Sequence, residues 1–331
     1  MANPVTFASS LQFTGIAKET QQGTAVPMTA TIPTDKFDNE DKVTMLEDTA
    51  NRGSMGDVYD NLLGVAHSEC TISGPVFADT LPWLLAGILG DIAAAGSAPV
   101  VHTIGLLNAG AANAQPTSYT FTDYTGIGTN KGRAWPGQMF ESVTIKWTAA
   151  GLCTYEAKTK GWPSSLLGAV PTPAASAVST VPSWKAAPTI AGSAVTNMED
   201  GEFTITRALD LIDTADGSQS PYFIRGGKVG MTFKFTQVAA DEVPLTNMLT
   251  NVIPTLGFTL DNGIAGAGME KFVLQMSKAA YRVSKRDISK ESVRFMVEGK
   301  AIHNTTDVGA SGGFGPCKFT VSNQVTAGTY A

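Results

Sequence analysis

Ionisable side chains are scarce in this chain of 331 residues. Charged residues make up 16% of it, well below the roughly 25% of an average soluble domain. Three cysteines lie far apart in apolar or alternating stretches. They fit neither a disulfide framework nor a metal site, and we expect buried thiols in a reducing compartment. The three histidines, His67, His102 and His303, are too dispersed for most acid–base or metal chemistry.

Other absences exclude further classes of protein. The opening residues have neither the basic start nor the apolar run of a secretion signal. The most apolar stretch, residues 81–101, is interrupted by glycine, proline and aspartate, so it does not span a membrane. A net charge of −6 argues against a basic surface for nucleic acid. The glycine-rich segments 126–132 and 226–228 lack the spacing of nucleotide-binding loops.

Carboxylates are the remaining route to catalysis, because two of them suffice for a glycosidase. The candidates are Glu199, Asp200 and Glu202, or Asp210, Asp213 and Asp216. Acidic loops explain both groups without any chemistry. We therefore predict no catalytic residue, no cofactor and no metal.

Strand signals dominate what is present. Short runs rich in Val, Ile, Thr and aromatic residues alternate in polarity, and turn residues bound most of them. These runs are 66–73, 118–123, 142–149, 153–158, 202–205, 228–237, 272–277, 280–284, 293–300 and 318–322. Asn262-Gly263 predicts a hairpin turn. The pattern predicts a mostly-β fold built from antiparallel sheets.

Two apolar helices interrupt the predicted strands. Each has apolar side chains spaced i, i+3, i+4, i+7 and i+8, which places them on one helix face. These are Leu81, Leu84, Leu85, Ile88 and Leu89 in the first helix, and Leu245, Met248, Leu249, Val252 and Ile253 in the second. Asp79 is the predicted N-cap of the first helix and Gly90 its end, and Pro254 stops the second.

The surroundings of the two helices repeat. Residues 64, 76, 78, 79 and 82 (Gly, Val, Ala, Asp, Pro) recur 162 positions later. We interpret this as an internal duplication; chance similarity between two β-domains is the alternative. The residues alone therefore predict two tandem β-domains, each with one of the two helices. They comprise residues 1–165, with an extended N-terminal arm, and 196–331, separated by a Pro/Ala/Ser-rich linker at 166–195.

Charges of opposite sign gather in two segments. The acidic segment 35–60 includes Asp35, Asp38, Glu40, Asp41, Glu47 and Asp48. The basic segment 278–300 includes Lys278, Arg282, Lys285, Arg286 and Lys290. A solvated loop and a solvated hairpin explain them simply. The sharper hypothesis is that the basic segment of one copy contacts the acidic segment of another.

Several motifs resemble one protein family. Gly15-Ile16-Ala17-Lys18-Glu19-Thr20, followed by Gly23-Thr24-Ala25-Val26-Pro27, resembles the opening of tail tube proteins from siphophages. Residues 48–55, the strand and helix at 64–90, and Trp135-Pro136-Gly137 before 142–158 are also similar. The match depends on the order of these motifs, because none is specific alone.

The resemblance implies a β-sandwich or barrel subunit that closes into stacked rings around a channel for genome DNA. Typical subunits supply one domain, six per ring. With two domains here, three chains would give the same pseudo-sixfold ring; six chains with one barrel each is the alternative. The implied partners are further copies, tail terminator, baseplate and distal tail proteins, and, in the channel, tape measure protein and DNA. No membrane is involved, and the protein would be a virion component assembled in the host bacterial cytoplasm.

Three other functions remain open from the residues alone. They are another virion component (a baseplate ring or a capsid decoration protein), a carbohydrate-binding β-sandwich and an enzyme. A carbohydrate-binding module should expose clustered aromatic side chains, whereas the tryptophans here are spread along the sequence.

Overall fold

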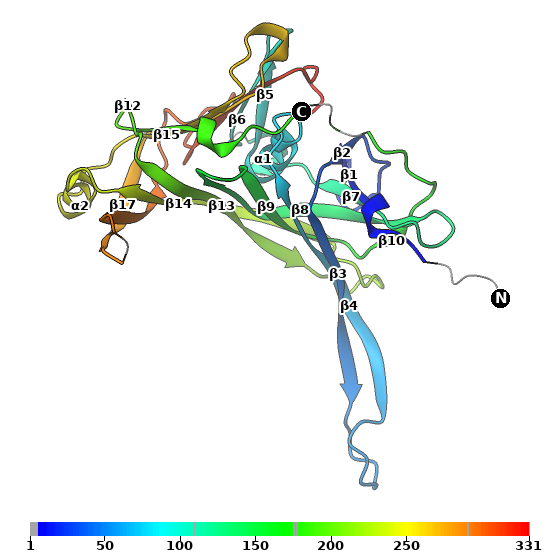
Figure 1. Ribbon diagram of the computed structural model, residues 1–331. Helices are drawn as coiled ribbons and strands as arrows, with labels where there is room; N and C mark the ends of the chain where they lie inside the picture. The colour runs from blue at the N-terminus through cyan, green and yellow to red at the C-terminus, as the bar shows by residue number, and fades with distance from the viewer. Residues whose placement is uncertain (1–5, 109, 175, 177, 290, 331) are drawn as a thin grey trace.

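The computed structural model describes residues 6–108, 110–174, 176, 178–289 and 291–330. These residues form nineteen β-strands, two α-helices and four short 3-10 helices, so the mostly-β prediction is confirmed. Two sheets of twelve and seven strands contain all the strands (Figure 1). The 3-10 helices are η1 (Ser9–Leu11), η2 (Ala111–Ala114), η3 (Ser183–Lys185) and η4 (Gly266–Gly268).

The larger sheet contains an unbroken antiparallel run of eight strands. In spatial order they are β3 (Lys36–Asp48), β4 (Asp60–Pro75), β9 (Thr154–Gly161), β8 (Gly132–Thr148), β13 (Met198–Ile212), β14 (Phe223–Val238), β18 (Arg294–Ala301) and β17 (Ala279–Asp287). The first half of β8 leaves this run and pairs with β10 (Ser165–Leu166) and β7 (Tyr119–Tyr124). Next to β7 lie β1 (Phe13–Lys18) and β2 (Ala30–Ile32).

The seven-stranded sheet covers one face of this run. Its order is β12 (Ser193–Ala194), β11 (Ala187–Ile190), β15 (Leu256–Asp261), β16 (Lys271–Met276), β19 (Lys318–Asn323), β6 (Val100–Leu106) and β5 (Gly90–Ala95). The core lies between the sheets: Trp147 of β8 has its ring centroid 4.4 Å from that of Phe258 on β15. Helix α1 (Leu81–Leu89) contacts β8, β6 and β5, and all nine of its residues are buried.

Period-two patterning separates the two faces of the eight-stranded run. On β9, Tyr155 and Ala157 are buried, whereas Glu156 and Lys158 lie on the opposite face. Apart from bulges in β3·β4, β8·β9, β13·β14 and β17·β18, neighbouring strands pair so that apolar side chains share one face, because a slip of one residue would move them all into solvent. The result is one apolar face toward the second sheet and one polar face, which we call the charged face.

Each half of the chain contributes four strands in the same arrangement. The hairpin β3–β4 corresponds to β13–β14, and the hairpin β8–β9 corresponds to β17–β18. In both halves, the second strands of the two hairpins pair with each other, as β4·β9 and β14·β18. Both sheets contain strands from both halves, through β8·β13 and β6·β19. The domain boundaries at 165 and 196 remain a prediction.

Several local predictions were wrong. The second helix, α2 (Val243–Leu249), ends before Val252, because Asn251 adopts a left-handed conformation with φ of 54°. Thr80, not Asp79, is the N-cap of α1. Asn262-Gly263 does lie in a hairpin, between β15 and β16, but it begins a loop over 262–270 and not a two-residue turn, with the Asn262 N–H donating to Glu270 O at 3.0 Å. The linker region contains β11 and β12, and β11 pairs with β15.

Candidate assembly surfaces

The acidic segment forms an edge strand, not the solvated loop that was the simple alternative. Within the described residues β3 pairs only with β4. Asp38 and Glu40 lie on the charged face, where each forms an ion pair with a lysine of the same strand. Lys36 Nζ is 2.9 Å from Asp38 Oδ2, and Lys42 pairs with Glu40. Both pairs are exposed, so their contribution to stability is small.

The other acidic candidates have different surroundings. Asp41 points toward the body of the protein, and its carboxylate accepts hydrogen bonds from the Ser164 N–H at 2.8 Å and the Ser164 hydroxyl at 2.5 Å. Asp35 precedes β3, and its N–H donates to Ser73 O at 2.8 Å. Glu47 and Asp48 lie at the far end of β3, where Asp48 pairs with Arg52.

The basic segment forms the opposite edge of the same run. Within the described residues β17 pairs only with β18. Arg282, Lys285 and Arg286 are exposed on β17, and Lys278 immediately precedes it. Lys290 lies outside the described residues. Within one chain the structure therefore does not bring the acidic and basic residues together, because they occupy the two ends of the eight-stranded run.

The charged face between these edges carries a set of ion pairs. Lys160 lies between two carboxylates, 3.6 Å from Glu69 and 3.5 Å from Glu141. Further pairs on this face are Lys146–Glu202 at 3.6 Å, Lys158–Glu156 at 3.7 Å and Lys234–Glu298 at 3.3 Å. His67, which was predicted to share a face with Glu69, does so, with Nε2 3.7 Å from Oε1. Cations and anions thus alternate across the face.

A long two-stranded arm extends from the body (Figure 1). Its base is held at Ala66, whose N–H donates to Gln219 O at 2.8 Å, while the Gln219 amide donates to Gly64 O at 3.0 Å. Beyond this point β3 and β4 pair only with each other. Large apolar side chains are nevertheless exposed on the arm: Val43, Met45, Leu46, Met55, Val58, Leu62, Leu63 and Val65. This arm was not predicted from the sequence, although apolar residues on either side of Arg52-Gly53-Ser54 could have indicated it.

Two glutamine side chains hydrogen-bond to the exposed edge of a third strand, β14. The first residues of β14 extend past β18, so within the described part of the chain their outer backbone groups have no strand partner. The Gln22 side-chain amide donates to Ile224 O at 3.0 Å and accepts from Ile224 N at 3.1 Å. The Gln115 amide makes the same two bonds with Gly226, at 3.1 and 2.7 Å. Each amide therefore makes the pair of hydrogen bonds that a neighbouring strand would make, and connects the first half of the chain to the second.

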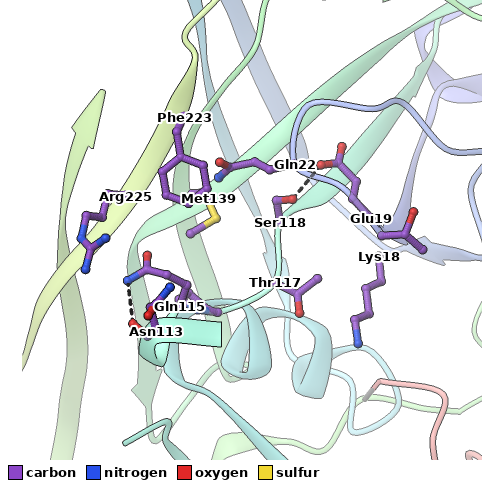
Figure 2. A pocket seen from close by; sticks show the side chains of 12 residues that line it. Lys18, Glu19, Gln22, Asn113, Gln115, Thr117, Ser118, Met139, Phe223 and Arg225 are labelled. Atoms are coloured by element: carbon purple, nitrogen blue, oxygen red, sulfur yellow. Dashed lines mark hydrogen bonds between the residues drawn. The ribbon is translucent and has the colours of Figure 1, made fainter. Parts of the chain in front are cut away.

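These glutamines line a pocket of about 770 Å³ (Figure 2). At its wall the buried Glu19 carboxylate accepts four hydrogen bonds, so no carboxylate oxygen is left to attack a substrate. The donors are the Ser118 and Thr120 hydroxyls at 2.7 Å, the Gly137 N–H at 2.7 Å and the Gly23 N–H at 3.0 Å. Glu19 therefore connects its own turn at 19–23 to residues 118–120 and to Gly137, which is a structural role.

The cysteines and His102 are also accounted for by packing. Burial raises the pKa of Cys153 to about 12 and also raises the pKa of the buried Cys70 and Cys317 thiols, so these thiols are inert. His102 is buried with Nε2 3.1 Å from Asn323 Oδ1, and burial lowers its pKa. Among the described residues there is no group of three or more His, Cys, Asp and Glu side chains suited to a metal ion. No helix within the described residues is both long and apolar enough to cross a membrane.

Fold and surfaces together define a β-structural protein whose largest sheet has two edges of opposite charge, together with an exposed apolar arm. The model of a phage tail tube protein family matches residues 9–297, and the chain belongs to that family. It is a structural protein of a bacteriophage tail. No curated protein matches the sequence significantly.

Proposed function

We propose that copies of this chain join edge to edge into closed rings, which stack into the tube of a long non-contractile tail. In each join, β17 of one copy pairs antiparallel with β3 of the next. The observation that carries this proposal is the β8·β13 join, which already connects the corresponding strands of consecutive halves inside one chain. Open strand edges are prone to pair with another chain, and ring closure satisfies both edges at once.

The charges at the two edges repeat the pattern of the internal join. Lys146 lies two residues before the end of β8, and Lys285 lies two residues before the end of β17. Glu202 and Glu40 are each the fifth residue of their strand. We therefore expect Lys285 to face Glu40 of the next copy, as Lys146 faces Glu202 within the chain.

Charge pairing alone would not hold such a ring together. An exposed ion pair contributes only about 0–1 kcal/mol. Complementary charges instead select partner, register and orientation, while backbone hydrogen bonds and buried apolar contacts supply the affinity.

The charged face supports a role as the lining of the channel. Each phosphate that a protein neutralises releases counterions and strengthens DNA binding. Six lysines on this face already have a carboxylate within 4 Å, which weakens the attraction of each for a passing phosphate: Lys36, Lys42, Lys146, Lys158, Lys160 and Lys234. DNA and the tape measure protein would therefore slide along this face without sticking.

The arm supports stacking of the rings. An isolated two-stranded ribbon is marginally stable in water, and this one exposes eight large apolar side chains that a partner would cover. We propose that each arm contacts the adjacent ring. Such a head-to-tail contact is heterologous and propagates into a filament, which terminator, distal tail and baseplate proteins would limit at its two ends.

Two four-stranded units per chain favour three chains per ring; six chains per ring is the alternative. The protein would have no catalytic activity, would assemble in the host bacterial cytoplasm and would remain in the virion tail. Negative-stain microscopy and native mass spectrometry of the purified protein test this proposal. We expect hollow tubes of uniform width whose rings contain three chains. Rings of six would overturn the stoichiometry, and a stable monomer at high concentration would overturn ring formation.

Charge reversal tests the join itself. Lys285→Glu and Glu40→Lys should each raise the critical concentration for assembly several-fold, and the double variant should restore it. Lys131→Glu, at an exposed turn, is the matched control and should assemble normally. Normal assembly of both single variants would contradict the β17·β3 join.

A further inference from the structure

The two helices occupy corresponding places but differ in burial. α1 follows β4 and α2 follows β14, each within a few residues, and neither contains a charged residue. Every residue of α1 is buried, whereas Pro244 is the one buried residue of α2. An uncharged helix with an exposed apolar surface is unusual in a protein that functions alone.

The second half of the chain helps to cover α1. Strand β13 contacts the helix. The Tyr330 ring, near the C-terminus, lies edge-on to Trp83 with centroids 5.2 Å apart. On the side of the first half, Tyr119 lies edge-on to the same indole at 6.1 Å. α1 is therefore enclosed where two consecutive halves meet.

Among the residues that the structure describes, α2 has a cover on one side only. It packs on β17, the edge strand. Its far side exposes Leu249 by 73% and Val243 by 50%, and the following Val252 is 48% exposed. A groove of about 330 Å³ runs between α2 and residues 190–195, with Tyr281 of β17 also lining it.

We propose that the first half of the next copy in the ring covers α2, as the second half covers α1 within the chain. This inference rests on the ring proposed above. Because α2 packs directly on β17, whatever pairs with β17 also arrives beside α2, and the two contacts form one continuous surface. The α2 contact supplies apolar affinity, and the charged edges supply register.

The double variant Leu249→Asp/Val252→Asp tests this contact, with Ile264→Asp as the matched control. Ile264 is 54% exposed in the loop after β15, away from α2. Both variants should keep the circular dichroism spectrum and thermal midpoint of the wild type. The α2 variant should remain monomeric or raise the critical concentration at least tenfold, while the control assembles normally. Wild-type assembly of the α2 variant would overturn the inference.

These experiments distinguish an error in the α2 contact from an error in the proposed ring. If the α2 variant assembles normally while the Lys285/Glu40 charge swap behaves as expected, only the α2 contact is wrong. If the wild type forms no rings, the proposed function is wrong as well. A photoreactive residue at position 249 should cross-link to residues 13–165 of another copy. Cross-links solely to the second half of another copy, or to another kind of molecule, would contradict the assignment.

Discussion

Lys146 on β8 lies 3.6 Å from Glu202 on β13, and this ion pair crosses the line where the two halves of the chain meet. Beside it, the hydroxyls of Thr144 and Thr204 are hydrogen-bonded at 3.1 Å. On the opposite face of the same join, the paired side chains of Ile145 and Phe203 are buried. The internal join thus combines polar pairing on one face with apolar packing on the other.

Reversing one charge of this pair should weaken the internal join slightly. Lys146→Glu places two carboxylates opposite each other and should lower the free energy of unfolding by about 1 kcal/mol. Adding Glu202→Lys should restore most of the loss. Urea unfolding of the two single variants and the double variant measures the coupling. Additive losses, with no rescue in the double variant, would show that the pair does not interact.

Replacing Gly201 by alanine should destabilise the folded protein far more than replacing Gly230 by alanine. A Cβ at Gly201 would lie 2.1 Å from the nearest atom of the Trp147 indole, which is wedged between two phenylalanine rings. Gly201→Ala should therefore cost about 1–3 kcal/mol through overpacking. At Gly230 the nearest atom would be 3.6 Å away, and Gly230→Ala should change stability by less than about 0.5 kcal/mol. Equal thermal midpoints for the two variants would contradict this packing.

The buried Glu19 carboxylate should not tolerate replacement by an amide. In Glu19→Gln, an NH2 group would face the hydroxyl and N–H donors that the carboxylate accepts from. Leaving such groups unpaired should cost about 3 kcal/mol. Glu156→Gln, at an exposed pair with Lys158, is the control and should be nearly neutral. Chemical denaturation at pH 7 compares the two, and similar midpoints would disprove the assigned role.

Glu270 should make stability depend on pH. Burial, reinforced by the nearby Asp79 carboxylate, raises its pKa from 4.5 to about 7. Because the folded-state pKa lies above the unfolded value, this group favours folding fully below pH 4.5. The contribution declines as the pH rises to about 7, by up to roughly 3 kcal/mol. Burial also raises the pKa of Asp79, which remains in Glu270→Gln, so the variant should show most, not all, of the decline removed, and the wild type should lose stability relative to it between pH 4.5 and 7. Parallel curves would contradict the shift.

The periodic parts of the fold were predictable from the sequence, because alternation over a half-buried strand is a local signal. Each of the ten alternating runs lies within a strand or extends beyond it by one residue at most; residues 228–237, for example, form most of β14. Strand β3 was missed because Asp, Asn and Glu have low strand propensity. Its pairing with β4 outweighs that propensity. α1 was predicted with its correct end at Gly90, which adopts the left-handed conformation with φ of 88°.

The assembly surfaces were predictable only in part. The two charged segments were found from composition, but their placement at opposite edges depends on which strands pair. The decisive contact joins Ser142–Thr148 to Asp200–Thr206, which are about 60 residues apart and carry no local signal for each other. The hydrogen bonds from the Gln22 and Gln115 amides to β14 were also not predicted. In the sequence, a glutamine that pairs with a strand edge cannot be told from any other surface glutamine.

The number of strands in the run between β3 and β17 has a consequence for polymerisation. Neighbours alternate in direction, and eight is even, so the two outermost strands point opposite ways. A copy placed beside another by rotation alone therefore meets it with the same antiparallel geometry used at every internal position. Deleting or adding a single strand would reverse one boundary and force a parallel contact there, so the parity of the sheet determines whether a closed circle can be built from identical parts.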